Sequence, residues 1–339
     1  TKEVIELFNS KAAEYFESLK RRVPEYSENW VMPEYFKDKL SEIAKLAKIQ
    51  ANEHRGMLVL EGEAGTGKNV LVDMFAHFTN RETFTFSCNF QTEKEDITYA
   101  FKFSPTKGTY QIDSRLIEML QTPGSVVILD EINTLPPGVS KMLNPLLDYR
   151  RSLYLPDGRQ IKADDSVLII GTMNPQHYLG VKPLSQEVKS RARIMEVDYP
   201  PEKDRSGKFS PDEAMILSKY VDSFSGAKQD EFELVWDYIV NNRKDNGGDK
   251  FLTPERERDI DRLNLIIKTA NRIREAYKAF RTGQSNEIIE FVFSIRETVD
   301  VATEINHEDD VRKAIKDVVL PKISDPSEKS RIETIIDNV

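Results

Sequence analysis

Residues 57–69, with the sequence MLVLEGEAGTGKN, decide the fold of this chain. The apolar run 57–60 predicts a buried strand, and apolar residues after position 69 recur at helical spacing. Between strand and helix, Gly62, Gly65 and Gly67 let backbone N–H groups turn inward, and the helix N-terminus adds partial positive charge. Lys68 would reach the terminal phosphates of a nucleotide. The order of strand, glycine-rich loop and helix therefore predicts a phosphate-binding loop rather than a chance turn.

The last position of this motif departs from the usual pattern. Ser or Thr is expected there, with its hydroxyl on Mg²⁺, and this chain has Asn69. The Asn carbonyl oxygen is an acceptable hard ligand, but the side chain is longer than a hydroxyl. We expect weaker Mg²⁺ affinity and slower turnover, with nucleotide binding retained. The predicted nucleotide-binding residues of the loop are Gly62, Glu63, Ala64, Gly65, Thr66, Gly67, Lys68 and Asn69, and Asn69 is also a predicted metal ligand.

Composition limits the classes of function. The 339 residues are enough for two structural units, and 48 Lys plus Arg against 57 Asp plus Glu give a net charge of −9. That charge offers a nucleic-acid backbone no global attraction. A single cysteine, Cys88, excludes an internal disulfide and predicts a small core residue in a reducing, cytoplasmic setting. No apolar run approaches the roughly 18 residues of a membrane span.

The rest of the chain is predicted to alternate strands and helices before becoming helical. Apolar segments predict strands at 57–60, 83–88, 125–129, 166–172 and 194–197, and their alternation with helices predicts a parallel α/β sheet. We expect an N-terminal helical segment at 1–50, with a stripe from Ile5 to Leu19 and a helix over 33–50. The α/β nucleotide-binding domain follows at 51–200, and a helical domain at 201–339. The charged run 255–262 is interpreted as a solvated helix face.

Two adjacent carboxylates end one of these strands. The apolar residues 126–129 lead directly to Asp130 and Glu131. Mg²⁺ prefers oxygen ligands, so Asp130 is predicted to hold the metal beside the loop. Glu131 is predicted to orient or deprotonate the attacking water. An acidic cap on the next helix is the alternative, and the phosphate-binding loop earlier in the chain makes it less favoured.

A further strand also ends in a polar residue. Residues 167–175, VLIIGTMNP, predict a buried strand that brings Asn174 to the same edge of the sheet. Its amide could position the water opposite Glu131, whereas the simpler interpretation is a turn ahead of Pro175. Before this strand, apolar arms around Pro156, Asp157 and Gly158 predict a β-hairpin over 153–161.

Taken together, the loop, the acidic pair, the hairpin and the segment Gly171 to Pro175 resemble an AAA+ ATPase of the MoxR type, whose relatives include CbbQ, NorQ and midasin. The resemblance covers residues 56–200 well and the helical remainder weakly. It implies a parallel-sheet P-loop domain with a C-terminal helical lid, ATP and Mg²⁺ as ligands, and a ring-forming remodelling chaperone, commonly a hexamer. It also implies a partner with a von Willebrand factor A domain. Asp130 and Glu131 then resemble the Walker B pair, and Asn174 the sensor-1 residue.

Two arginines take roles from the same resemblance. The segment 184–191 resembles the helix that ends in the arginine finger, so Arg191 would act in a neighbouring subunit's site, with Lys189 and Arg193 close enough to be confused with it. Residues 293–296 resemble the sensor-2 pattern, which makes Arg296 a nucleotide-binding candidate. An ordinary surface arginine and a solvated helix face are the simpler interpretations of these two residues.

Two other functions compete. One is a nucleic-acid translocase or restriction-type motor, in which the hairpin lines a pore and the charge comes from Arg150, Arg151, Arg159 and Lys162; the net charge of −9 disfavours it. The other is a nucleotide-gated scaffold in which Asn69 has removed efficient hydrolysis and left the binding switch.

Overall fold

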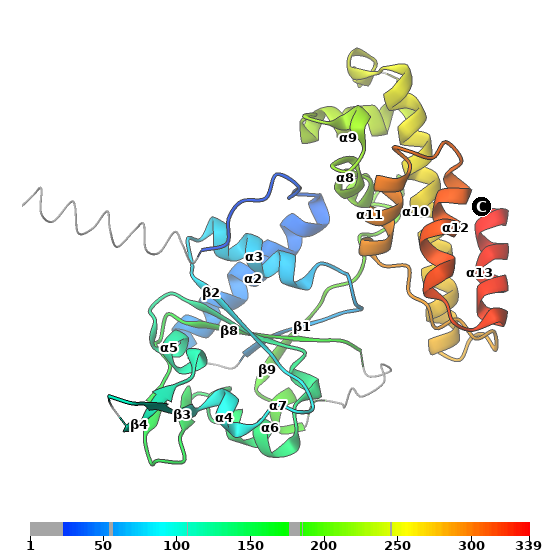
Figure 1. Cartoon of the computed structure of the whole chain (residues 1–339). Helices are drawn as coiled ribbons and strands as arrows, with labels where there is room; N and C mark the ends of the chain where they lie inside the picture. Colours follow the sequence, from blue (N-terminus) through cyan, green and yellow to red (C-terminus); the bar gives the residue numbers. More distant parts are fainter. Residues whose placement is uncertain (1–22, 54–56, 107, 176–183, 185, 245) are drawn as a thin grey trace, which may run out of the picture. The chain divides into compact units, whose positions relative to one another are not determined.

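The computed structural model describes residues 23–53, 57–106, 108–175, 184, 186–244 and 246–339. Two compact units are present (Figure 1). The first includes residues 39–63 and 67–197, and the second includes 27–38, 64–66 and 198–339. The predicted stripe from Ile5 to Leu19 lies outside the described residues.

A five-stranded parallel sheet forms the centre of the first unit. Its strand order is β2-β5-β8-β1-β9, and every pairing is parallel. Parallel order brings the carboxyl ends of all the strands to one edge, which is where the candidate residues were predicted. The α/β fold class is confirmed, and the strands match the five predicted segments: β1 (Met57–Glu61), β2 (Thr83–Ser87), β5 (Val126–Asp130), β8 (Leu168–Met173) and β9 (Ala192–Glu196).

Helices cover both faces of this sheet. Figure 1 shows α2 (Glu34–Glu53) and α3 (Lys68–Phe78) on one side, and α5 (Arg115–Gln121) and α6 (Pro137–Leu143) on the other. Strands β1, β5 and β8 are therefore almost continuously buried, as strands covered on both faces are. Short segments complete the unit: α4 (Lys94–Ile97), η1 (Ile132–Thr134) and α7 (Gln186–Lys189).

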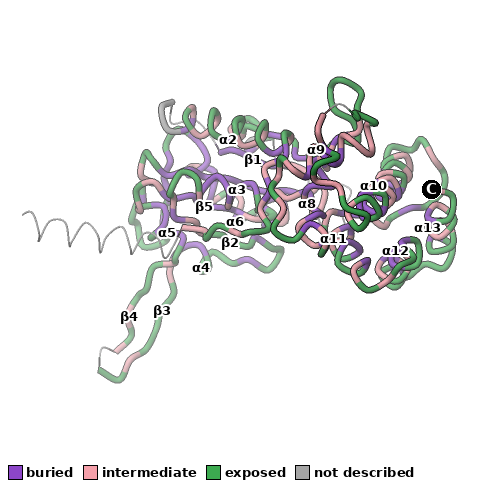
Figure 2. The backbone as a smooth tube through the Cα atoms, turned by 90° about the horizontal axis from the view of Figure 1, so that it is seen from above, coloured by how far each residue is buried: buried purple, intermediate pink, exposed green. Residues whose placement is uncertain are grey.

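Two antiparallel hairpins extend from this unit. The predicted one forms from β6 (Ser152–Tyr154) and β7 (Gln160–Lys162). The other, β3 (Tyr99–Ser104) with β4 (Gly108–Asp113), was not predicted and is mostly exposed (Figure 2). An ionic contact joins them: Arg159 donates two hydrogen bonds to the Asp113 carboxylate, at 2.8 and 2.7 Å.

The second unit is helical, as expected for the C-terminal part of the chain. Its core gathers apolar side chains from most of its helices around Trp236, which is 1% exposed. Among the described helices, none combines the length and the apolar character that a membrane crossing requires. The elements are α8 (Asp212–Ser218), η2 (Asp222–Phe224), α9 (Gln229–Ile239), η3 (Gly248–Phe251), α10 (Pro254–Arg281), α11 (Ile295–Glu304), α12 (Val311–Val319), η4 (Leu320–Lys322) and α13 (Pro326–Asn338).

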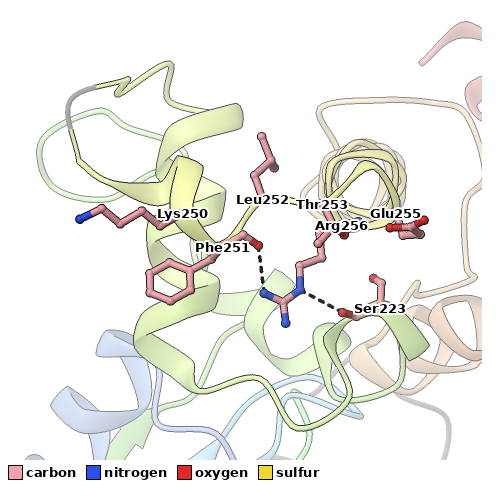
Figure 3. A pocket seen from close by; sticks show the side chains of 7 residues that line it. All are labelled: Ser223, Lys250, Phe251, Leu252, Thr253, Glu255 and Arg256. Atoms are coloured by element: carbon pink, nitrogen blue, oxygen red, sulfur yellow. Dashed lines mark hydrogen bonds between the residues drawn. The ribbon is translucent and has the colours of Figure 1, made fainter.

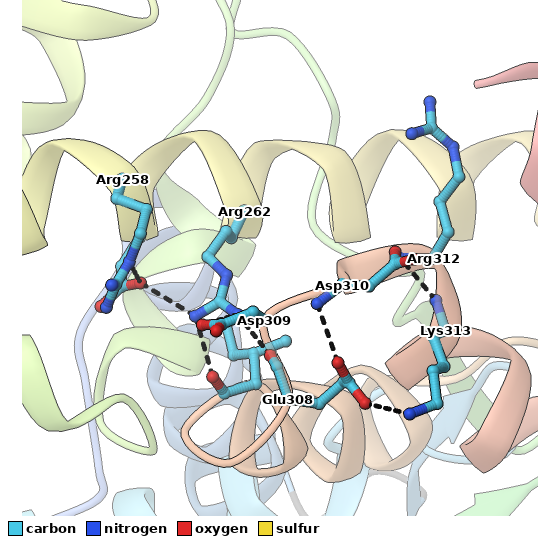
Figure 4. Close-up of polar contacts among 9 residues, drawn as sticks. Arg258, Arg262, Glu308, Asp309, Asp310, Arg312 and Lys313 are labelled. Carbon is cyan, nitrogen blue, oxygen red and sulfur yellow. Dashed lines mark hydrogen bonds and ion pairs between the residues drawn. The ribbon is translucent and has the colours of Figure 1, made fainter.

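The charged run at the start of α10 is not simply a solvated face, so this interpretation of the sequence was wrong in part. Asp259 and Arg262 are buried. Arg262 donates to Asp259 at 3.2 Å, to the Ile305 carbonyl at 2.8 Å and to the Glu308 carbonyl (Figure 4). The guanidinium thus satisfies the carbonyls at the end of α11, a pairing over more than 40 residues that charge patterning along one helix does not reveal.

A buried ion pair stabilises the second unit. Arg274 donates to both oxygens of Glu213, at 2.6 and 2.8 Å, and the Thr298 hydroxyl donates to the same carboxylate at 3.0 Å. Both charged side chains are almost fully buried. We expect Glu213→Ala to lower the free energy of unfolding by about 3–5 kcal/mol, because it leaves the Arg274 charge buried and unpaired.

Chemical denaturation followed by circular dichroism measures this effect. Glu333→Ala is the matched control, since it removes a half-exposed carboxylate and leaves Lys316 its contact with Asp337. We expect no measurable shift of the unfolding midpoint for that variant. Equal shifts of the unfolding midpoint for the two variants would show that the buried Glu213–Arg274 pair stabilises the protein no more than an exposed pair does.

Candidate nucleotide-binding site

The glycine-rich loop begins at the end of β1 and ends in the first turn of α3. The Gly62 N–H donates to the Met173 carbonyl at 3.2 Å, which ties the start of the loop to the end of β8. Gly67, at φ 87° and ψ 17°, immediately precedes α3, and this left-handed conformation suits glycine. Lys68 is therefore the first residue of the helix and Asn69, which is exposed, is the second. The strand, loop and helix form in the predicted order.

Three predicted residues are joined by hydrogen bonds at the edge of the sheet. The Lys68 ammonium donates to the Gly62 and Glu63 carbonyls at 2.7 and 2.9 Å, and to Asn174 Oδ1 at 3.1 Å. The Asn174 amide in turn donates to Glu131 Oε1 at 3.3 Å. A lysine, an amide and a carboxylate from three parts of the sequence thus converge where phosphates and a water would meet in phosphoryl transfer.

The acidic pair contacts a residue that the sequence analysis missed. Thr172, on β8, donates its hydroxyl to Asp130 Oδ1 at 2.5 Å and accepts the Glu131 N–H at 3.0 Å. Its position two residues before Asn174 was visible in the sequence. Its contacts with Asp130 and Glu131 could not be predicted without the strand order, in which β5 and β8 are neighbours.

The tip of the loop groups with the helical unit. A Cβ on residue 65 would lie 2.5 Å from Ser294 Oγ and 3.8 Å from Arg296 Cγ, and φ at Gly65 is +73°. Both the close approach and the left-handed backbone require glycine there. The Tyr199 hydroxyl donates to the Ala64 carbonyl at 2.9 Å. Arg296, exposed in the first turn of α11, therefore has its stem beside Gly65, and its role toward a nucleotide stays a prediction.

Arg191 is not part of this cluster of Lys68, Asn174 and Glu131. Its Nε lies 3.8 Å from Asp148 Oδ2, and its side chain is 25% exposed. Asp148 is also held by Arg150, whose Nη2 donates at 2.6 Å. Burial works against the charged form of Asp148, but the hydrogen bonds from Arg150 outweigh it, and its pKa lies below the ordinary value. The Asp148 carboxylate therefore lies close to two guanidinium groups, those of Arg150 and Arg191.

The residues present fit a magnesium ion. Mg²⁺ in nucleotide sites binds through one or two carboxylates, the phosphates and water, not through an all-protein cage. Among the described residues no cluster of three His, Cys, Asp or Glu side chains forms such a cage. Thr172 occupies Oδ1 of Asp130 and leaves Oδ2 for the metal or its waters. Asn69 adds an exposed amide oxygen at the start of α3.

The four basic residues of the nucleic-acid alternative do not form a free cationic surface. Arg151 is 1% exposed and donates to the Asp164 and Val167 carbonyls. Arg150 pairs with Asp148 and Arg159 with Asp113 and Asp157, and Lys162 lies 3.7 Å from Asp165. These partners weaken the case for a phosphate-backbone interface at the β6–β7 hairpin.

Two other features of the chain do not add to the site. Burial, followed by the charges of Asp130 and Glu131, raises the pKa of the Cys88 thiol to about 12, so Cys88 is the predicted core residue and not a nucleophile. A hollow of about 420 Å³ lies at the start of α10 (Figure 3). Arg256 spans it, donating to the Ser223 and Phe251 carbonyls at 3.0 Å each.

Comparison with known proteins agrees with this geometry. Residues 57–192 match the model of the AAA domain of the dynein-related subfamily. An uncharacterized protein of Staphylococcus epidermidis is 30% identical over 158 residues, which is 45% of this chain and 58% of that protein. One of Staphylococcus haemolyticus is 31% identical over 159 residues, again 45% of this chain and 59% of that protein. The chain thus spans somewhat more than half the length of these relatives.

A crystal structure of a candidate ATPase from Cytophaga hutchinsonii covers 99% of this chain and 98% of its own, with 16% identity and a TM-score of 0.40. The matched range contains four of the five sheet strands, β1, β2, β5 and β8, with the loop, the acidic pair and Asn174. Residues 57–192 of this chain are therefore similar to an AAA domain.

Proposed function

We propose that this chain is an ATPase that binds ATP with Mg²⁺ and hydrolyses it to drive conformational work. The observation that carries the proposal is the line of hydrogen bonds from Lys68 through Asn174 to Glu131. A phosphate-binding cation and a carboxylate able to accept a proton are thereby connected through one amide. Hydrolysis requires this combination, whereas nucleotide binding alone does not.

Each residue has one role in this proposal. Lys68 and the loop N–H groups hold the phosphates, and Arg296 contacts them from α11. Asp130 and Asn69 would hold Mg²⁺, which would supply positive charge beside the phosphoryl oxygens. Glu131 accepts the proton of the attacking water, and Asn174 orients that water against Glu131. Arg191 completes the site of a neighbouring copy.

The finer assignment follows the resemblance to MoxR-type proteins. We propose a homo-oligomeric ring, a hexamer by that resemblance, that remodels other proteins in the cytoplasm together with a von Willebrand factor A domain partner. The position of Arg191 apart from Lys68, Asn174 and Glu131, beside Asp148, supports a role in the site of a second copy. Nucleic acid is the less favoured partner because the candidate basic residues are paired or buried.

The first test is magnesium-dependent ATP hydrolysis by this chain and by Asn69→Thr. We expect Asn69→Thr to raise the rate about tenfold at limiting Mg²⁺, because a compact hydroxyl replaces a longer amide at the metal. Rates are measured across a Mg²⁺ titration, with the oligomeric state followed by light scattering. Asn69→Gln is the control, since it retains an amide and should not raise the rate.

The outcomes separate the proposed functions. Turnover by the unaltered chain supports the ATPase. Tight ATP binding without turnover, rescued by Asn69→Thr, would favour the nucleotide-gated scaffold. If the unaltered chain and Asn69→Thr hydrolyse ATP at equal rates at every Mg²⁺ concentration, Asn69 is not a ligand of the metal.

A further inference from the structure

Thr172 lies at the centre of the acidic pair and is 1% exposed. A hydroxyl has one proton to donate and lone pairs to accept with. In Thr172 the proton goes to Asp130 Oδ1 at 2.5 Å, the short distance of a charge-assisted bond, and a lone pair accepts the Glu131 N–H at 3.0 Å. One buried side chain thus contacts both candidate catalytic positions.

The contact with Glu131 acts on an unusual backbone. Glu131 has φ 56° and ψ 44°, the left-handed region that is rare for a residue with a side chain. Such a conformation is strained for a residue with a side chain and persists only where surrounding contacts hold it. Here the N–H is held by Thr172, and the Glu131 carbonyl accepts from the Thr134 N–H at 2.9 Å and hydroxyl at 2.8 Å.

The same strand also holds the side chain of Glu131. Thr172 and Asn174 are two residues apart at the end of β8, a spacing that points both toward one face. Asn174 donates to the Glu131 carboxylate, and Thr172 accepts from its backbone. Strand β8 and the residue that follows it therefore contact Glu131 at two points and Asp130 at one.

We propose that Thr172 is a positioning residue that orients the Asp130 carboxylate toward Mg²⁺ and holds the left-handed turn at Glu131. This inference rests on the proposed ATPase function. The hydroxyl fixes the rotation of the Asp130 carboxylate by binding one oxygen, so that the other is presented at the edge of the sheet. Partners of this kind, one shell behind the ligands, typically alter metal affinity or activity by about 10–100-fold.

The test compares Thr172→Val, which keeps the shape and removes the hydroxyl, with Thr172→Ser, which keeps the hydroxyl. Thr98→Val is the matched control: Thr98 is 2% exposed and its hydroxyl donates to the Lys94 carbonyl, away from the acidic pair. Three quantities are measured: kcat and KM for ATP, the gain in affinity for a non-hydrolysable ATP analogue on adding Mg²⁺, and hydrogen exchange at the Glu131 amide.

We expect Thr172→Val to lower kcat about 10–100-fold with KM nearly unchanged, to reduce the magnesium-dependent gain in affinity, and to speed exchange at the Glu131 amide. Thr172→Ser should restore all three, and Thr98→Val should change none. Unchanged exchange and an unchanged magnesium effect in Thr172→Val would overturn the inference. If the unaltered chain neither hydrolyses ATP nor binds the analogue, the proposed function fails, while the exchange measurement still reports on Thr172.

Discussion

Replacing Glu131 with glutamine should lower ATP turnover by about 10²–10⁴-fold and leave ATP affinity within a few fold. Glutamine has the size of glutamate and can keep a contact with Asn174, but it cannot accept a proton from water. The groups that would hold the phosphates, Lys68 and the loop amides, are untouched. Steady-state hydrolysis and calorimetric ATP binding, measured on the same preparation, separate the two effects.

A carboxylate outside the site provides the control for this prediction. Glu95 is exposed on α4, and Glu95→Gln makes the same change of charge without touching the site. Its turnover should equal that of the unaltered chain. If Glu131→Gln also turned over normally, Glu131 would not be the base. A loss of binding together with turnover would instead indicate a disturbed turn at position 131, which a melting curve would detect.

Arg191→Ala should lower turnover in the assembled protein by about 10³-fold or more, the scale at which a trans-acting arginine contributes. The guanidinium lies apart from the chain's own cluster of Lys68, Asn174 and Glu131, beside Asp148, so each chain should still bind ATP normally. Hydrolysis by the variant oligomer and ATP binding by the variant chain are the measurements.

Mixing two inactive variants tests whether Arg191 acts in the neighbouring site. Arg191→Ala supplies an intact Glu131, and Glu131→Gln supplies an intact arginine. In an equal mixture about a quarter of the sites combine both, so activity should reappear on mixing. Lys189→Ala and Arg193→Ala, mixed in the same way, identify a neighbouring cation if one carries the role. If Arg191→Ala, Lys189→Ala and Arg193→Ala all stay inactive when mixed with Glu131→Gln, none of these three side chains acts in the site of a neighbouring copy.

The sequence alone predicts those residues of the site that directly follow a predicted strand or begin the helix after the glycine-rich loop. An apolar run that ends in a polar residue predicts a buried strand with a side chain at its carboxyl end, and parallel strands bring such ends together. Lys68, Glu131 and Asn174 could therefore be predicted as neighbours, and the structure places them within hydrogen-bonding distance.

The rest depends on contacts between distant segments. From the sequence, Thr172 is predicted only as a strand residue. Its contact with the acidic pair follows from the pairing of β5 with β8, which the sequence does not give. From the sequence, Arg262 is predicted to be a surface charge. In the structure it donates to a backbone carbonyl at the end of α11, which is distant in the sequence. Apolar and polar residues alternate in the β3–β4 hairpin, as in a strand with one buried face. Phe101 and Phe103 are exposed, however, so the hairpin does not follow the rule that apolar residues of a strand face a core.

The link between the two hairpins has a consequence for their motion. An isolated two-stranded ribbon in water fluctuates on its own. The paired hydrogen bonds from Arg159 to Asp113, together with the bond from Gln111 to Asp157, join β3–β4 to β6–β7, so we expect the two hairpins to fluctuate together. Because β7 leads within a few residues into β8, the strand that carries Thr172, we expect a restraint on the hairpins to restrain the start of that strand as well.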